Sequence, residues 1–197
     1  MNRSSFLKLL AAGLYPTLRA QGFRGSGTTL RRLPEPIVHV FHFQGSANAD
    51  RYYLNLGAHL SFLPPEGGLQ VPCAKFDDAH CIFRARIDPP APAYAWHYGH
   101  NEGEALSVIQ NIAAQWQQQA VPFFSAYSPY PAAFLGLVSV HVPVGNRTTL
   151  HFARIAVHLG LIEQAVTFAR EGLVHTPERA SLLRSSFAVL LKKLSAA

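Results

Sequence analysis

Cysteine, charge and long apolar runs are scarce in this chain of 197 residues. Its two cysteines, Cys73 and Cys81, are too few for a disulfide framework, and this favours a reducing, cytoplasmic compartment. No stretch reaches the roughly 18 consecutive apolar residues that a membrane span needs. Charged residues make up only 14% of the chain and hydrophobic residues 49%, which excludes a disordered protein and allows a sizeable core.

Familiar catalytic motifs are also missing. The chain contains no Gly-x-Ser-x-Gly elbow, no Gly-Lys-Ser/Thr phosphate loop and no His-Glu-x-x-His helix. Residues 25–29 resemble a phosphate-binding loop, but they follow a predicted helix and precede a predicted strand, so a plain turn is the preferred interpretation. The adjacent carboxylates Asp77 and Asp78 are expected to form a solvated turn. We therefore expect no catalytic residue and no cofactor.

Histidine, in contrast, is abundant, and the ten residues of this type raise the question of a metal site. The best group is His97 and His100, followed by Glu102 and Glu104, because imidazoles and carboxylates are ligands that zinc accepts. Their spacing matches no closed zinc site. An aromatic loop with partly exposed histidines is the preferred interpretation, and we expect no metal.

The chain is basic, with 17 Lys and Arg against 11 Asp and Glu and a formal net charge of +6. These positive charges are spread along the sequence, and the only tight cluster is Arg24, Arg31 and Arg32. Three residues are too few for the basic stripe that is typical of nucleic-acid binding. Weak nucleic-acid binding through this cluster therefore stays as one alternative.

The first twenty residues predict an amphipathic helix. Their start is similar to a twin-arginine export signal, but Ser4 stands where the second arginine belongs, and Lys8 and Pro16 interrupt the apolar stretch. Apolar residues instead recur at helical spacing from Phe6 onward. We expect a helix over residues 3–20 that bends at Pro16 and ends at Gly22, with export left as an alternative.

Four segments after this helix have the composition of strands: 28–33, 37–44, 52–60 and 81–87. In the third segment every second residue from Tyr52 to Leu60 is apolar. In the fourth, apolar residues from Cys81 to Ile87 alternate with arginine. Strands with one apolar face each indicate an antiparallel sheet that is packed on one side and solvated on the other. Residues 45–50 are expected to form a hairpin loop.

The second half of the chain is expected to be mainly helical. A strong helical stripe begins at Glu102 and should end at Pro122, residues 130–144 suit either helix or strand, and Thr176 and Pro177 predict the start of a final helix. The predicted fold is α+β, with an antiparallel sheet of about four strands packed by the N-terminal helix and followed by a helical C-terminal half. We expect one domain over residues 1–197, divided into parts 1–100 and 101–197.

The solvated face of the predicted sheet is the best candidate for a binding surface. Donors, an aromatic ring and two guanidinium groups share it, and this chemistry suits recognition of carboxylate, phosphate or protein. The alternative is an ordinary solvated face, or one that the C-terminal helices cover. The predicted binding residues, with His42 beside them, are Gln44, Tyr53, Asn55, His59, Arg84 and Arg86.

Three segments occur in an order that resembles a known family. They are 40–44 (VFHFQ), 53–57 (YLNLG) and 81–87 (CIFRARI), and they follow a first helix closed by Gly22 and Phe23. The order resembles that of a bacterial family catalogued as domain of unknown function 4304, over about residues 5 to 125. The resemblance implies the order of the elements and a cytoplasmic location. It implies no activity, cofactor or catalytic residue.

From these patterns we expect a non-enzymatic protein-binding module, and within that class an immunity protein that neutralises a bacterial toxin. Inhibitors of nucleases are commonly acidic, so this basic chain would need a target with an acidic surface. The alternative is a binder of a small anionic ligand, or an enzyme, that uses the polar face of the sheet.

Overall fold

The computed structural model describes residues 1–46, 51–65 and 70–196. They form two compact units, residues 1–127 and residues 128–197. Residues 47–50 of the expected hairpin loop lie outside the described residues. The prediction of a single domain stays a prediction. Within the described residues, no helix is long and apolar enough to cross a membrane.

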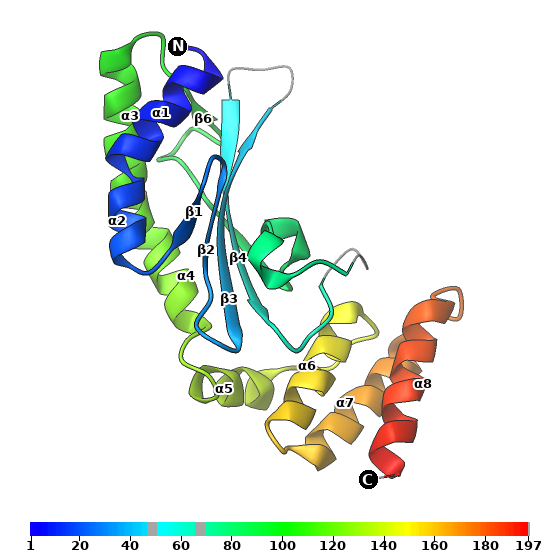
Figure 1. The fold of residues 1–197 in the computed structure, drawn as a ribbon. Helices are drawn as coiled ribbons and strands as arrows, with labels where there is room; N and C mark the ends of the chain where they lie inside the picture. Colours follow the sequence, from blue (N-terminus) through cyan, green and yellow to red (C-terminus); the bar gives the residue numbers. More distant parts are fainter. Residues whose placement is uncertain (47–50, 66–69, 197) are drawn as a thin grey trace. The chain divides into compact units, whose positions relative to one another are not determined.

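The first unit is built on an antiparallel sheet (Figure 1). Its strands in spatial order are β1 (Arg24–Ser26), β2 (Thr29–Arg32), β3 (Ile37–Gly45), β4 (Arg51–Leu60) and β5 (Phe83–Ile87), and β6 (Trp96–His97) also pairs with β4. The antiparallel α+β fold is as predicted, but the sheet has two more strands than expected. At three and two residues, β1 and β6 are too short for the alternation that identified the others.

Helices cover one face of this sheet. Figure 1 shows α1 (Arg3–Gly13), α2 (Tyr15–Ala20), α3 (Glu102–Gln115) and α4 (Val121–Ala126) on the same side. Phe6, Leu10 and Trp116 are fully buried there against apolar residues of β3 and β4. The N-terminal helix covers the packed face as predicted, and it divides next to Pro16. Pro122 does not end the helix that begins at Glu102. A π-helical turn over Trp116–Ala120 follows α3, and Pro122 then lies in the first turn of α4, where its missing N–H costs nothing.

Among the described residues of the first unit, a single segment covers one end of the other face of the sheet. The segment after β4 crosses it through two short 3₁₀ turns, η1 (Cys73–Lys75) and η2 (Asp78–His80). Val38, Val40, Phe76 and Cys81 form a small apolar cluster between this segment and the sheet. The sequence placed Cys81 on the helix-covered face, and this is wrong. Strand β5 begins only at Phe83, so the alternation does not extend back to Cys81.

The second unit is helical, with α5 (Ala132–Val140), α6 (Arg147–His158), α7 (Ile162–His175) and α8 (Ser181–Ser195). Residues 141–144, which suited either state, belong to no helix and pair with no described strand. The predicted cap at Thr176 and Pro177 is wrong. The Thr176 hydroxyl donates to the carbonyl of Gly172 at 2.5 Å and closes α7, while α8 begins four residues after Pro177.

Candidate functional site

Polar side chains gather at the uncovered end of the second sheet face, where they line a hollow of about 620 Å³. His42 on β3, Asn55 on β4 and Arg86 on β5 lie opposite one another in the strand register. Directly paired residues on neighbouring strands have Cβ atoms about 5 Å apart, so the three side chains form one row. We name this hollow the polar pocket. Its lining is His42, Gln44, Asn55, Asp77, Asp78, Ala79, Arg84, Ala85 and Arg86.

A glycine lets the 3₁₀ turns approach the sheet and form one wall of the polar pocket. A Cβ atom on Gly57 would lie 2.6 Å from Cys81 Sγ and 3.3 Å from Asp78 Cα. No larger residue fits at this position without displacing Cys81, which directly follows η2. Phe76, which is fully buried, holds the same segment down, with its ring edge against His59 and its face on His80. Its carbonyl also accepts a hydrogen bond from Arg31.

The first pair of the wall is His42 and Asp78. The imidazole Nδ1 of His42 donates to Asp78 Oδ1 at 2.5 Å. Burial by itself would raise the pKa of Asp78, but the hydrogen bond from His42, the charge that His42 carries when it is protonated and a hydrogen bond from Asn55 outweigh it and hold the pKa below its ordinary value. The Asp78 carboxylate is therefore ionised at neutral pH, and it already accepts hydrogen bonds from His42 and Asn55.

The second pair is Asp77 and His80, which closes the turn itself. Asp77 is the N-cap of η2: its side chain accepts from the backbone N–H of Ala79 at 3.0 Å and lies 2.6 Å from His80 Nδ1. The backbone N of Asp77 lies 3.2 Å from the same ring nitrogen, which accepts from this N–H in one tautomer and donates to the Asp77 carboxylate in the other. The sequence predicted a solvated turn for both aspartates. The structure instead engages each carboxylate with a histidine.

A relay of hydrogen bonds runs across the sheet from β5 through β4 to β3. Arg86 Nε donates to Asn55 Oδ1 at 3.2 Å, and Asn55 Nδ2 donates to Gln44 Oε1 at 2.8 Å. The guanidinium of Arg86 also stacks over the ring of Tyr53, with Cζ 4.3 Å from the ring centroid. Four of the predicted residues, Gln44, Tyr53, Asn55 and Arg86, are thus brought together.

Arg84 stands two residues before Arg86 on the same face of β5, and its side chain is exposed. It makes no hydrogen bond or ion pair with any residue that the structure describes. Among the described residues, Arg86 forms a hydrogen bond through Nε alone. Its two Nη groups make no hydrogen bond with a described residue and remain available to a ligand. Two guanidinium groups therefore line the same hollow.

His59 does not belong to this site. It lies on the predicted face of β4, but only 1% of it is exposed because Phe76 and the start of the crossing segment cover it. Its Nε2 lies 3.2 Å from the carbonyl of Leu63. Sequence alternation assigns a side chain to a face and says nothing about what docks on that face.

Two residues of the site were missed by sequence reasoning, Asp77 and Asp78, and His42 was mentioned without being selected. No periodic signal identifies Asp78, because it lies outside every strand and 36 residues from His42. The doublet of aspartates before a histidine was the only available signal, since Asp followed three residues later by a hydrogen-bonding side chain is typical of a capped turn.

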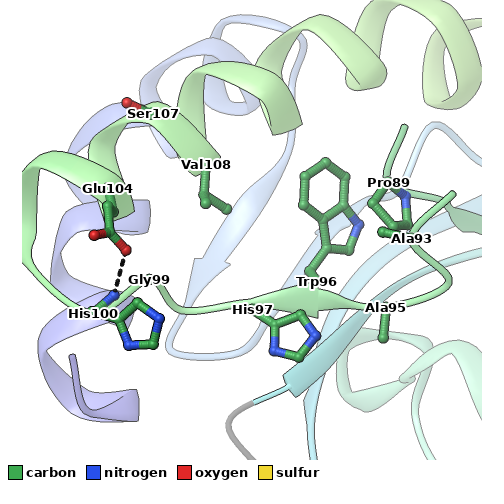
Figure 2. A pocket seen from close by; sticks show the side chains of 10 residues that line it. All are labelled: Pro89, Ala93, Ala95, Trp96, His97, Gly99, His100, Glu104, Ser107 and Val108. Carbon is green, nitrogen blue, oxygen red and sulfur yellow. Dashed lines mark hydrogen bonds between the residues drawn. The ribbon is translucent and has the colours of Figure 1, made fainter. Parts of the chain in front are cut away.

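A second, more apolar hollow of about 470 Å³ lies where the 88–101 loop meets α3 (Figure 2). It contains the predicted metal candidates His97, His100 and Glu104. Both carboxylate oxygens of Glu104 are used at the helix start, one by the backbone N–H of His100 at 2.8 Å and one by Asn101 Nδ2 at 2.9 Å. Within the described ranges, no three His, Cys, Asp or Glu residues are grouped so that they could hold a metal ion.

The arginine cluster behind the nucleic-acid alternative is engaged within the protein. Arg32 donates to His39 Nδ1 and to the carbonyl of Gln21, and its guanidinium lies over the rings of Phe23 and Phe124. Arg24 donates to two backbone carbonyls, and Arg31 to that of Phe76. These contacts leave fewer donors for phosphates than the sequence suggested.

Comparison with known proteins adds one finding. No curated protein and no solved structure matches the chain. One family model matches residues 14–126, and its description is a domain of unknown function, DUF4304. The matched span starts between α1 and α2 and ends with α4, so it includes the whole sheet and the polar pocket. Because this span exceeds half of the 197 residues, the chain belongs to the DUF4304 family.

Proposed function

We propose that this protein is a non-enzymatic binding module that recognises an anionic group through the polar pocket. The observation that carries the proposal is the pair Arg84 and Arg86. Both are exposed on one face of β5, and the two carboxylates that line the polar pocket with them, Asp78 and Asp77, are bonded to His42 and His80. Neither guanidinium group forms an ion pair with an acidic residue in the described ranges, and such groups favour bidentate binding of an external carboxylate or phosphate.

The partner that we favour is a protein with an acidic surface. The net charge of +6 would speed its approach, because complementary charge steers two proteins together before contact. The Tyr53 ring under Arg86 adds an aromatic residue of the kind that concentrates binding energy at interfaces. Within this class we propose an immunity protein that neutralises a toxin, in the cytoplasm of a bacterium.

The test is affinity capture from the native host with quantitative mass spectrometry. Wild-type bait should retain one stoichiometric protein, and the double variant Arg84→Ala, Arg86→Ala should lose it. Arg19→Ala is the matched control, because it removes an exposed arginine from α2, on the helix-covered side of the sheet. Equal capture by the wild type and the double variant would move the interface away from the polar pocket. A bait that stays alone would count against a protein partner.

A small anionic ligand is the second candidate, and the shape of the site favours it. A hollow of about 620 Å³ falls within the range of about 300–1,000 Å³ that is typical of small-molecule sites. A thermal-shift screen of phosphates, nucleotides and carboxylates tests this form. The melting temperature of the wild type should rise with the right class of anion, and that of Arg84→Ala should not. An equal rise in Arg84→Ala would remove this residue from the site.

A further inference from the structure

The hydrogen-bond relay fixes which groups of the polar pocket remain as donors. Because Arg86 Nε can only donate, the Asn55 atom that faces it is the carbonyl oxygen, and Asn55 Nδ2 must then donate to Gln44 Oε1. The relay therefore uses only the oxygen of the Gln44 amide, and its N–H groups can donate to a ligand. Gln44 lies on β3 beside His42, whereas the two arginines lie on β5 and form a wall whose guanidinium groups only donate hydrogen bonds.

The facing wall offers an acceptor. Asp78 is ionised, so the hydrogen between it and His42 belongs to the imidazole Nδ1. In the neutral ring the lone pair is then on Nε2, the nitrogen on the far side of the ring from Asp78 Oδ1. Nε2 makes no hydrogen bond with a residue that the structure describes, and His42 lines the polar pocket with a partly exposed side chain.

Donor wall and acceptor stand a short distance apart. His42 and Arg86 occupy the same row on strands separated by β4, so their backbones are about 10 Å apart. Both side chains rise from the same face, and the side chain between them, Asn55, is 4% exposed and forms the floor. A ligand that touches both walls must carry a hydrogen-bond donor only a few bonds from its anionic group.

We propose that the polar pocket binds a hydroxyl-bearing anion of the polyol phosphate or hydroxy acid class. Arg84 and Arg86 hold the anionic group, and the neutral ring of His42 accepts the hydrogen bond of the neighbouring hydroxyl at Nε2, with Asp78 as the positioning residue. This inference rests on the proposed anion-binding function and adds the identity of the second group that the site reads.

Two probes that differ only in hydroxyl groups test it. Glycerol 3-phosphate and propyl phosphate carry the same anion, and their dissociation constants can be measured by NMR titration of the full chain. Glycerol 3-phosphate should bind about threefold to tenfold more tightly, as expected for one added hydrogen bond. In His42→Phe the ratio of the two constants should fall to about one. Glycerate against propionate repeats the comparison for a carboxylate.

The outcomes separate this inference from the proposed function. If wild type binds both probes equally and Arg84→Ala weakens both, the anion site stands and the hydroxyl contact is overturned. If the wild type binds none of the four probes, the small-ligand form of the anion site and the hydroxyl contact are both overturned. Arg19→Ala should behave as wild type. If His42→Phe does not fold, long-range ¹H–¹⁵N spectra of the wild-type imidazole decide instead: the neutral Nδ1–H tautomer is expected for His42, and either the Nε2–H tautomer or a ring protonated on both nitrogens would overturn the assignment.

Discussion

Gly57 determines how closely the crossing segment approaches the sheet. It is buried in β4, opposite Val40 on one side and Arg84 on the other, at a point where a side chain would normally rise. The sulfur of Cys81 occupies that space instead, and the backbone of Asp78 passes beside it. The absence of one side chain thus brings the Asp78 carboxylate within reach of His42.

Replacing this glycine should destabilise the fold. The new Cβ in Gly57→Ala would lie 2.6 Å from Cys81 Sγ, and we expect the free energy of unfolding to fall by about 1–3 kcal/mol, as for other overpacked cores. Urea denaturation followed by tryptophan fluorescence measures this, because both tryptophans, Trp96 and Trp116, lie in the first unit.

The control for this prediction is Gly136→Ala in α5. A Cβ atom at Gly136 would have no described atom within 4 Å, and alanine is the better helix former by about 1 kcal/mol. Circular dichroism at 222 nm monitors the helical unit in which this control lies. Destabilisation by Gly136→Ala, or none by Gly57→Ala, would contradict the steric explanation.

At the scale of elements, the short turn η2 matters more than its three residues suggest. It supplies one wall of the polar pocket, and Asp77 caps it. Asp77→Ala should cost about 1 kcal/mol of stability, as for other N-caps, and should raise the hydrogen-exchange rate of the Ala79 and His80 amides. Hydrogen exchange followed by NMR measures the effect residue by residue.

Asp88→Ala is the matched control for the cap, because Asp88 is exposed and only its backbone makes the hydrogen bonds to Gln119. It should leave both amides unchanged. Protection of Ala79 and His80 that survives Asp77→Ala would show that Phe76 and Cys81 hold the turn without its cap.

The strands and helices also show which features of the fold can be predicted from sequence periodicity. Alternation on β4 and β5 correctly placed Tyr53, Asn55, Arg84 and Arg86 on one face, because period two is a property of the extended chain itself. It failed at Cys81, where the chain had not yet entered the strand. Pro122 was misread for a related reason: a proline is tolerated in the first turn of a helix, and the π-helical turn before it has no signature in composition.

At the scale of the whole molecule, stability should fall in acid. Burial and the charge of Arg32 lower the pKa of His39 to about 3, so this side chain stays neutral in the folded state while it becomes charged in the unfolded state below about pH 6.5. The unfolded state then binds more protons, and the free energy of unfolding should fall by up to about 1.4 kcal/mol per pH unit between about pH 6 and pH 4. Asp78, with its lowered pKa, adds a further loss at lower pH.

The pH dependence can be assigned by substitution. His39→Gln keeps an acceptor for Arg32 but cannot be protonated, so it should flatten the slope between pH 6 and pH 4 in urea denaturation followed by tryptophan fluorescence. The exposed His100 is the matched control, and His100→Gln should leave the slope unchanged. A slope that is equal in wild type and His39→Gln would assign the acid sensitivity to other groups.

The sequence by itself determined the α+β class, the antiparallel sheet, the helix that covers it and the face on which the arginines lie, because these follow from periodicities of 2 and 3.6 residues along the chain. Only the tertiary structure decided that His59 is covered, that Cys81 fills the space at Gly57 and that Asp78 meets His42. Those contacts depend on where a non-periodic segment docks, and docking is set by shape and packing between residues far apart in the chain, which no local pattern records.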